Sequence, residues 1–194
     1  MEENEHKGWH SRKGLPHYDV GGLTQFITFR LFDSLPKEFL NELKEEMKLS
    51  KGNIEKERYE KIQKQLDQGS GSCILREAQC AQIVQDSLKF LDGVKYQLDA
   101  WVVMPNHVHF LARFHHGQLM SKAMHSLKSF TGHEIKKLHP ELEGIWQIES
   151  YDRYIRNEEH YWNTLRYIHN NPVESRICKT AEQFRWSSAY QGSN

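Results

Sequence analysis

Apolar and polar residues alternate along several short stretches of the chain, and this alternation predicts strands. The segment "LTQFITFRLF" at 23–32 alternates and is rich in β-branched and aromatic residues, so we expect a strand after the Gly21-Gly22 turn. The segments "KYQLDAWVVM" and "HVHFLARF" flank a short turn at 104–106 and predict a β-hairpin. A further short strand or extended segment is expected within 144–156.

Elsewhere the apolar residues recur at helical spacing. Residues 75–93 follow a period near 3.6 and end at a glycine, and residues 120–139 follow a similar pattern. Residues 157–171 begin with an asparagine cap and two glutamates, and we expect this helix to end before Pro172. The order strand, helix, hairpin, helix, short strand, helix predicts an α+β fold with a mostly antiparallel sheet.

A highly charged segment interrupts this order at 36–68. It contains eight basic and eight acidic residues at helical spacing, with a break near Gly52. Helices of mixed charge usually face water, so we expect an exposed helical hairpin inserted into the domain. The sequence "GSGS" that follows lacks the pattern of a phosphate-binding loop and predicts a plain loop. With residues 1–22 as an N-terminal arm, we expect 1–194 to form a single domain.

Charge and composition limit the kinds of partner. Lysine plus arginine number 26, as do aspartate plus glutamate, so any surface for nucleic acid must be local. Nine phenylalanines, eight tyrosines and five tryptophans argue against a disordered chain. Most of the twelve histidines lie after residue 100, which fits metal, proton or phosphate chemistry there and equally fits a solvated surface.

The cysteines and the absence of long apolar runs bear on the compartment. Cys73, Cys80 and Cys178 are odd in number and have no C-x-x-C spacing, so neither a disulfide framework nor a cysteine zinc knuckle is indicated. The N-terminal segment lacks an apolar signal core, and no stretch approaches the roughly 20 apolar residues of a membrane span. We expect a cytoplasmic protein with no membrane segment.

Two histidines stand one residue apart in the second strand of the predicted hairpin. Alternation places His107 and His109 on one face, while Val108 points to the other. Two neutral imidazoles at this separation can share one divalent ion. The other interpretation is that one histidine bonds a backbone carbonyl and the other is solvated, and for an isolated pair that outcome is the more frequent one.

The last predicted helix offers a third ligand and a nucleophile. Its apolar stripe is Tyr161, Leu165 and Ile168, and a polar ridge beside it is formed by His160, Asn163, Tyr167 and Asn171. The ridge position places Tyr167 off the core face. An oxygen donor would suit a hard ion that acts as a Lewis acid on a phosphate. A tyrosine held beside that phosphate could cut and rejoin a nucleic-acid strand, because the cation favours the phenolate. A packing role is the alternative for any single tyrosine.

Several blocks of the chain resemble one known family. "WVVMPNHVHFL" resembles the HUH segment (His, bulky apolar, His) of single-tyrosine transposases, and "YIHNNPV" resembles the block that contains their catalytic tyrosine. "MHSLKSFTGHEIKK", "IWQIESYDRYIRNEEHY" and "FRWSSAY" follow the order and approximate spacing of the REP-associated tyrosine transposases (RAYTs), which are IS200-like transposases. The resemblance covers nearly the whole chain except the charged segment.

The resemblance implies a ferredoxin-like α/β sandwich and a specific chemistry. His107 and His109 would bind Mg²⁺ or Mn²⁺ with Asn171 as the third protein ligand, and Tyr167 would attack a phosphate of single-stranded DNA. The products would be a 5′-phosphotyrosine adduct and a free 3′-OH. The implied partner is single-stranded or hairpin DNA from repetitive palindromes, and the protein would act as a monomer or a homodimer.

Basic residues near these blocks are candidates for contact with the DNA backbone. The candidates are Arg153, Arg156 and Arg166 around the tyrosine, and Lys122, Lys128, Lys136 and Lys137 on the helix at 120–139. Arg153 and Arg156 match the family's "D-R-x-x-R" element, which favours them over the others. A solvated charge is the alternative for each residue.

The chain departs from the family pattern after "NPV". Family members usually continue with a basic residue and then Ala-Gly-Leu, whereas Glu174-Ser175-Arg176-Ile177 follows here. The lost glycine is expected to alter the turn after the helix, and Glu174 would repel a nearby phosphate.

Three functions are therefore compatible with the sequence. The first is a metal-dependent transposase or endonuclease that acts through Tyr167. The second is a domesticated module that binds hairpins without productive transposition. The third is a small zinc hydrolase that uses His107 and His109, although no H-E-x-x-H motif supplies an acidic base.

Overall fold

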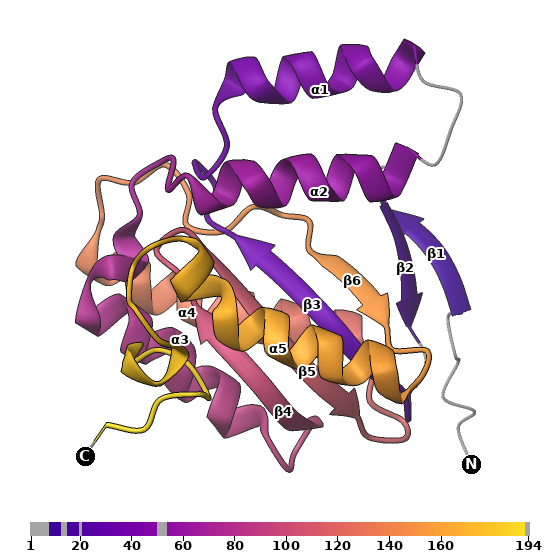
Figure 1. Ribbon diagram of the computed structural model, residues 1–194. Helices are drawn as coiled ribbons and strands as arrows, with labels where there is room; N and C mark the ends of the chain where they lie inside the picture. The colour runs from indigo at the N-terminus through magenta and orange to yellow at the C-terminus, as the bar shows by residue number, and fades with distance from the viewer. Residues whose placement is uncertain (1–7, 13–14, 20, 50–53, 193–194) are drawn as a thin grey trace.

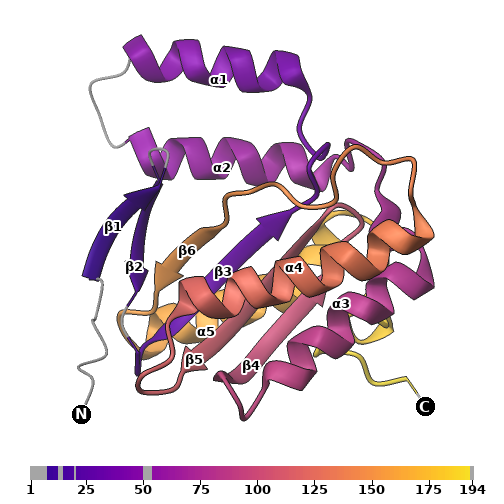
Figure 2. The same cartoon turned by 180° about the vertical axis from the view of Figure 1, so that it is seen from behind.

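A four-stranded antiparallel sheet forms the centre of the protein, as seen in a computed structural model that describes residues 8–12, 15–19, 21–49 and 54–192. Its order is β4-β5-β3-β6, and the strands are β3 (Thr24–Arg30), β4 (Tyr96–Val103), β5 (His107–Phe114) and β6 (Tyr151–Tyr154). Helices α3 (Ala78–Leu91) and α4 (Met120–Leu138) cover one face of the sheet, as Figure 2 shows. Helix α5 (Glu158–Glu174) crosses the other face (Figure 1).

The order of these elements defines the fold. Both β3 and β4 pair antiparallel with β5, so they run parallel to each other with β5 between them. The chain thus forms β3-α3-β4 and β5-α4-β6 as two interleaved units, which is the ferredoxin-like arrangement. The predicted fold class is confirmed, and the strands and helices expected from periodicity are all present.

Alternation along β5 separates two apolar cores. Val108, Phe110 and Phe114 pack in the core beneath α3 and α4. Leu111 belongs to the second core, where it is buried together with Ile168 of α5. His107 and His109 share the parity of Leu111, so they face α5 rather than α3 and α4.

The charged segment forms two helices, as predicted, α1 (Lys37–Leu49) and α2 (Ile54–Asp67). The expectation of a fully exposed hairpin is wrong for α2, which lies between α1 and the sheet in Figure 1. Gln63 and Leu66 are buried, and the Tyr59 ring stacks on Tyr151 of β6 with centroids 3.9 Å apart. One face of α2 is formed by uncharged residues, among them Tyr59, Gln63 and Leu66, and that face packs against the sheet side of the domain.

The N-terminal arm contains a small hairpin of its own. Strands β1 (Gly8–Arg12) and β2 (Leu15–Asp19) pair antiparallel, and β2 lies beside β6 (Figure 1). The three cysteines are free, in agreement with the absence of a disulfide framework. Within the described part of the chain, no helix has the length and apolar character needed to cross a membrane.

Helix α5 begins where the sequence predicted and ends later. The side chain of Asn157 accepts a hydrogen bond from the backbone N–H of His160 at 2.8 Å, which caps the first turn. The helix then continues through Pro172 to Glu174, so the expected end before the proline is wrong. A proline lacks only its own N–H, and the next turn still forms because Ser175 donates to the carbonyl of Asn171.

One residue in the turn after α5 has a left-handed backbone conformation. Arg176, at the position of the glycine in the family pattern, has φ of 57°. That conformation costs a non-glycine residue about 1–2 kcal/mol. The backbone therefore adopts at Arg176 the conformation that a glycine favours, and the departure from the pattern adds strain at this turn.

Candidate active site

Strand β5 and helix α5 bring together the four residues that the sequence singled out. The rings of His107 and His109 lie with centroids 4.6 Å apart, and the Tyr167 ring is 5.4 Å from that of His109. Asn171 is one turn beyond Tyr167 on α5, and its side chain lies near that of His107 without a hydrogen bond of ordinary geometry between them. Both histidines and Asn171 are fully buried.

Hydrogen bonds fix the orientation of both imidazole rings. His107 Nδ1 lies 2.8 Å from Asn106 Oδ1, and His109 Nδ1 lies 2.8 Å from Thr28 Oγ1. The Asn106 amide donates to the carbonyls of Leu66 and Ser70, so its oxygen faces His107 and Nδ1 of that ring is the donor. Nε2 of His107 therefore carries a free lone pair, as a metal-ligating histidine requires.

The atoms that would bind an ion have no other partner. Nε2 of His107, Nε2 of His109 and both amide atoms of Asn171 are buried and make no hydrogen bond among the described residues. A buried polar atom left unsatisfied costs about 1–3 kcal/mol. Two imidazole nitrogens and the amide oxygen of Asn171 are atoms that a divalent cation accepts as ligands, so one ion would give each of these three atoms a partner and leave only the Asn171 Nδ2 of this group unsatisfied.

Burial also keeps the histidines neutral. Loss of solvent lowers the pKa of His107 to about 3. The same cause, with His107 as a second contributor, holds the pKa of His109 well below its ordinary value. At pH 7 both rings are uncharged, which is the state in which histidine binds a metal.

Acid should destabilise the metal-free protein through these two histidines. Their pKa is depressed in the folded state, so the unfolded chain takes up protons first as the pH falls below about 6.5. With a chelator present, the free energy of unfolding is expected to fall by up to about 1.4 kcal/mol per pH unit for each histidine. Urea unfolding at a series of pH values measures this slope.

A His107→Gln variant separates the contribution of His107 to this pH dependence from the contributions of other titratable groups. Burial raises the pKa of the Asp67 carboxyl to about 6, which acts in the opposite direction because the folded state then binds the extra proton. The slope between about pH 6.5 and 5 should be shallower in the variant than in the wild type. Equal slopes would show that His107 is not held neutral by burial.

Tyr167 faces the sheet. Its ring packs edge-on against Phe26 at 6.0 Å, so the expectation that it stands off the core face is wrong. Its hydroxyl donates to Gln63 Oε1 at 3.1 Å, and burial, followed by the nearby Asp67, raises its pKa above the ordinary value. Of the predicted polar ridge, Asn171 turns inward with Tyr167, whereas Asn163 is exposed.

Sequence reasoning missed several neighbours of these residues. Gln63 and Tyr59 lie in the charged segment, where only the spacing of uncharged residues along one helical face could have indicated them. Thr28 is opposite His109 in the β3–β5 register, which no local pattern reveals. Asn106 lies in the predicted turn at 104–106, and nothing in that pattern indicated its hydrogen bond to His107.

The three predicted DNA-binding arginines lie near α5 and are exposed. Arg153 lines a pocket together with Tyr167. The guanidinium of Arg156 lies 5.7 Å from the centre of the Tyr154 ring, and Arg166 donates to Asn163 at 2.6 Å. Their contact with DNA stays a prediction.

The predicted lysines lie on α4, which is across the sheet from α5, the helix that contains Tyr167 (Figure 2). Lys128 Nζ donates to the carbonyls of Gln147 and Ile148 at 2.6 and 2.7 Å, and Lys136 donates to the carbonyl of Leu142. Lys122 is exposed. The structure therefore places Arg153, and not these lysines, in one pocket with Tyr167.

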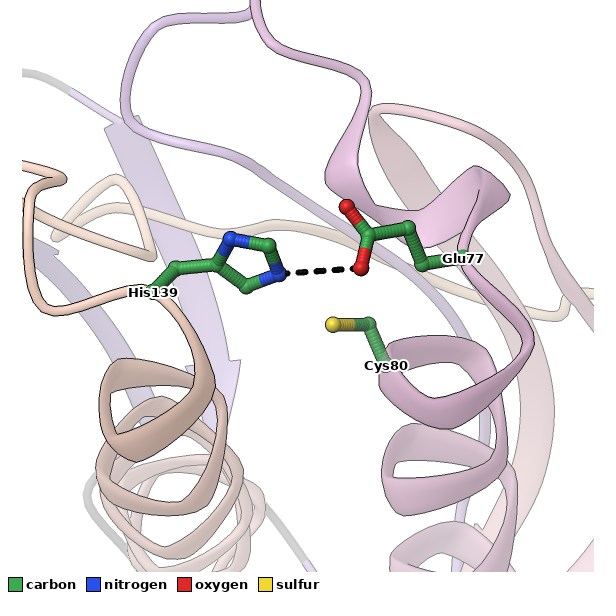
Figure 3. Close-up of side chains that lie close together, drawn as sticks. All are labelled: Glu77, Cys80 and His139. Atoms are coloured by element: carbon green, nitrogen blue, oxygen red, sulfur yellow. Dashed lines mark hydrogen bonds and ion pairs between the residues drawn. The ribbon is translucent and has the colours of Figure 1, made fainter.

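A second group of possible metal ligands lies on the α3 and α4 side (Figure 3). Among the described residues, Glu77, Cys80 and His139 form one group whose ligand atoms all lie within 4.8 Å of one another. His139 Nε2 is 3.1 Å from Glu77, and its Nδ1 is 3.2 Å from Glu141. Burial raises the pKa of Cys80 to about 11, so its thiol is protonated without a metal. This group could hold an ion but lies across the sheet from Tyr167.

Comparison with known proteins gives a consistent picture. One similar protein is a REP-associated tyrosine transposase from Escherichia coli (strain K12), 29% identical over 98 residues, which are 50% of this chain and 56% of the relative. The match thus spans little more than half of that relative. A solved structure of a REP-associated tyrosine transposase bound to a REP hairpin has a TM-score of 0.60 at 20% identity, covering 92% of this chain and 82% of that chain, and so shares the fold.

The family assignment rests on a longer match. The sequence model of the family described as "Transposase IS200 like" matches residues 54–171. This range contains α2, all of β4 and β5, and α5 as far as Asn171. Since it takes in more than half of the chain, the protein belongs to the IS200-like transposase family.

Proposed function

We propose that the protein is a metal-dependent transposase that binds hairpin-containing single-stranded DNA and cleaves and rejoins it through Tyr167. One observation supports this above the others. The phenol lies beside three buried side chains, His107, His109 and Asn171, whose ligand atoms have no hydrogen-bond partner among the described residues. A nucleophile and an ion site in contact are what phosphoryl transfer from DNA requires.

His107, His109 and Asn171 would hold the ion, Mg²⁺ or Mn²⁺. Bound there, it would supply Lewis-acid polarisation of a phosphate and favour the phenolate form of the tyrosine. Asn106 and Thr28 hold the two rings in place from behind. Gln63 orients the Tyr167 hydroxyl by accepting its hydrogen bond.

The reaction balances without a further cofactor. The Tyr167 oxygen attacks phosphorus and loses its proton, and the bond from phosphorus to the 3′ oxygen breaks. That oxygen takes up a proton and leaves as a free 3′-OH, while the 5′ phosphate stays on the tyrosine. Attack by a 3′-OH on the phosphotyrosine reverses the step and rejoins a strand.

The substrate class follows from the relatives and from the local charge. The solved relative of the same fold is bound to a REP hairpin, and we propose the same kind of DNA here. The chain has no net charge, so backbone contacts would depend on local groups such as Arg153, Arg156 and Arg166.

Labelled hairpin DNA tests this function. With Mn²⁺, the wild type should form a covalent adduct that keeps a 3′-end label, whereas a 5′-end label should leave with the fragment that ends in 3′-OH. A chelator should prevent both the adduct and the release of the 5′-labelled fragment. Binding of the hairpin without cleavage in any divalent metal would identify a binding module instead, and a 5′ label in the adduct would exclude this polarity of attack.

A further inference from the structure

An open pocket of about 460 Å³ adjoins the candidate active site. Helix α2 forms one wall, β6 and the first half of α5 form the others, and Phe26 and Tyr167 are among the lining residues. Pockets of about 300–1,000 Å³ hold small ligands. Because Tyr167 is itself part of the lining, anything that fills the pocket would lie next to the group that Tyr167 attacks.

The lining of the pocket is aromatic. Tyr59 and Tyr151 stack with centroids 3.9 Å apart and an angle of 21° between their planes. Phe26 and Tyr167 add two further rings, which meet edge to face. Aromatic surfaces of this kind bind unpaired nucleobases, because every base has a flat π face.

Charged and amide groups surround the rings. Arg153 and Lys64 are exposed at the pocket and can approach a phosphate, whereas Glu60 and Asp67 in the same lining would direct the phosphate toward the two cations and away from themselves. Asn163 also lines the pocket. Its Oδ1 accepts a hydrogen bond from Arg166, so its amide N–H groups do not take part in that bond. A base, a sugar and a phosphate together need this combination of flat apolar surface, amide and cation.

We infer that this pocket holds one unstacked nucleotide of the DNA strand, the one adjoining the phosphate that Tyr167 attacks. The inference rests on the proposed function and adds a role for α2. The charged hairpin then supplies part of the substrate site, through Tyr59, and recognises a base that lies outside the DNA hairpin itself.

Binding without a metal tests the pocket separately from the chemistry. The probe is a DNA hairpin with single-stranded tails of mixed sequence, in which one abasic residue is moved along the tails. Fluorescence anisotropy in the presence of a chelator measures the affinity of the protein for each probe. One tail position is expected to weaken binding by roughly tenfold when its base is removed, and distant positions should not.

The variant Tyr59→Leu keeps an apolar side chain but removes the ring. It should bind the intact and the abasic probe at that position with nearly equal affinity. Tyr161→Leu, which changes a half-buried tyrosine of α5 outside the pocket, is the matched control and should keep the difference. Thermal unfolding of both variants verifies that they fold.

The outcomes separate the two proposals. No adduct with labelled DNA, but a base-dependent affinity that Tyr59→Leu removes, would contradict the chemistry and support the pocket. Adduct formation with equal affinity for every abasic probe would support the chemistry and overturn the pocket. The inference also fails when Tyr59→Leu keeps the full effect of the abasic residue, or when the wild type binds none of the probes.

Discussion

Tyr167→Phe is expected to abolish the covalent protein–DNA adduct while it leaves hairpin binding almost unchanged and lowers the unfolding temperature by only about 2–4 °C. The substitution removes only the hydroxyl, which is the proposed nucleophile, so the cleavage rate should fall by about 10⁴-fold or more. The ring keeps its contacts with Phe26 and His109. The lost hydrogen bond to Gln63 should cost about 1 kcal/mol of folding free energy.

A second tyrosine of the same helix provides the control. Tyr161 is also half-buried and packs in the same apolar cluster, but it is not among the residues around His109. Tyr161→Phe should form the adduct at the wild-type rate on a denaturing gel with 3′-labelled hairpin DNA. Survival of the adduct in Tyr167→Phe, or its loss in Tyr161→Phe, would falsify the assignment of the nucleophile.

The elements of the fold could be predicted because their signals are local. Alternation in 23–32 and in the hairpin, and helical spacing in 75–93 and 120–139, depend only on neighbours along the chain. Helix α3 begins at Ala78, three residues after the start of the helical pattern, and the end of α5 was predicted wrongly. Proline was expected to stop the helix, but at Pro172 only one backbone donor is lost and the following turn supplies its own bonds.

The candidate site could be predicted only in part. The spacing of His107 and His109 fixes their common face, and helical spacing puts Tyr167 and Asn171 on one side of α5. The apolar stripe correctly indicated the side of α5 that faces the sheet, but it placed Tyr167 off that side, which is wrong because the buried side is wide enough to include Tyr167. Packing decides how wide the buried side is, since Ile168 and Asn171 are both buried and bring the tyrosine inward with them.

The contribution of α2 had only a weak local signal, the spacing of a few uncharged residues along one face of the helix. Its sequence is dominated by alternating charges, and the partners of its buried face lie far along the chain, with Tyr151 on β6 and Tyr167 on α5. Tyr59 and Gln63 become recognisable as part of the site only once β6 and α5 are in place. A single sequence contains little information about which residues far apart in the chain will be in contact, so this part of the site could not be predicted.

His109→Gln and His107→Gln are expected to remove the response to the metal. If the two imidazoles and Asn171 bind Mn²⁺, the ion stabilises the wild type by about 2.7 kcal/mol at a concentration one hundred times its dissociation constant. In the wild type this stabilisation should raise the unfolding temperature when Mn²⁺ is added. Each variant should lose that rise, because glutamine replaces an imidazole ring that a hydrogen bond with Asn106 or Thr28 holds in position. Adduct formation should fall by about 100-fold or more.

The second group of possible ligands makes the test specific. Cys80→Ala and His139→Gln change the group of Glu77, Cys80 and His139, which lies across the sheet from Tyr167. Cys80 is buried, so Cys80→Ala lowers the unfolding temperature itself, but the increase in unfolding temperature caused by Mn²⁺ and the adduct yield should match the wild type in both variants. An ion held by that group could not polarise a phosphate at Tyr167, since the sheet lies between them. Loss of the adduct in Cys80→Ala or His139→Gln, with His107→Gln and His109→Gln still active, would therefore place the essential ion on the wrong face for this mechanism and contradict it.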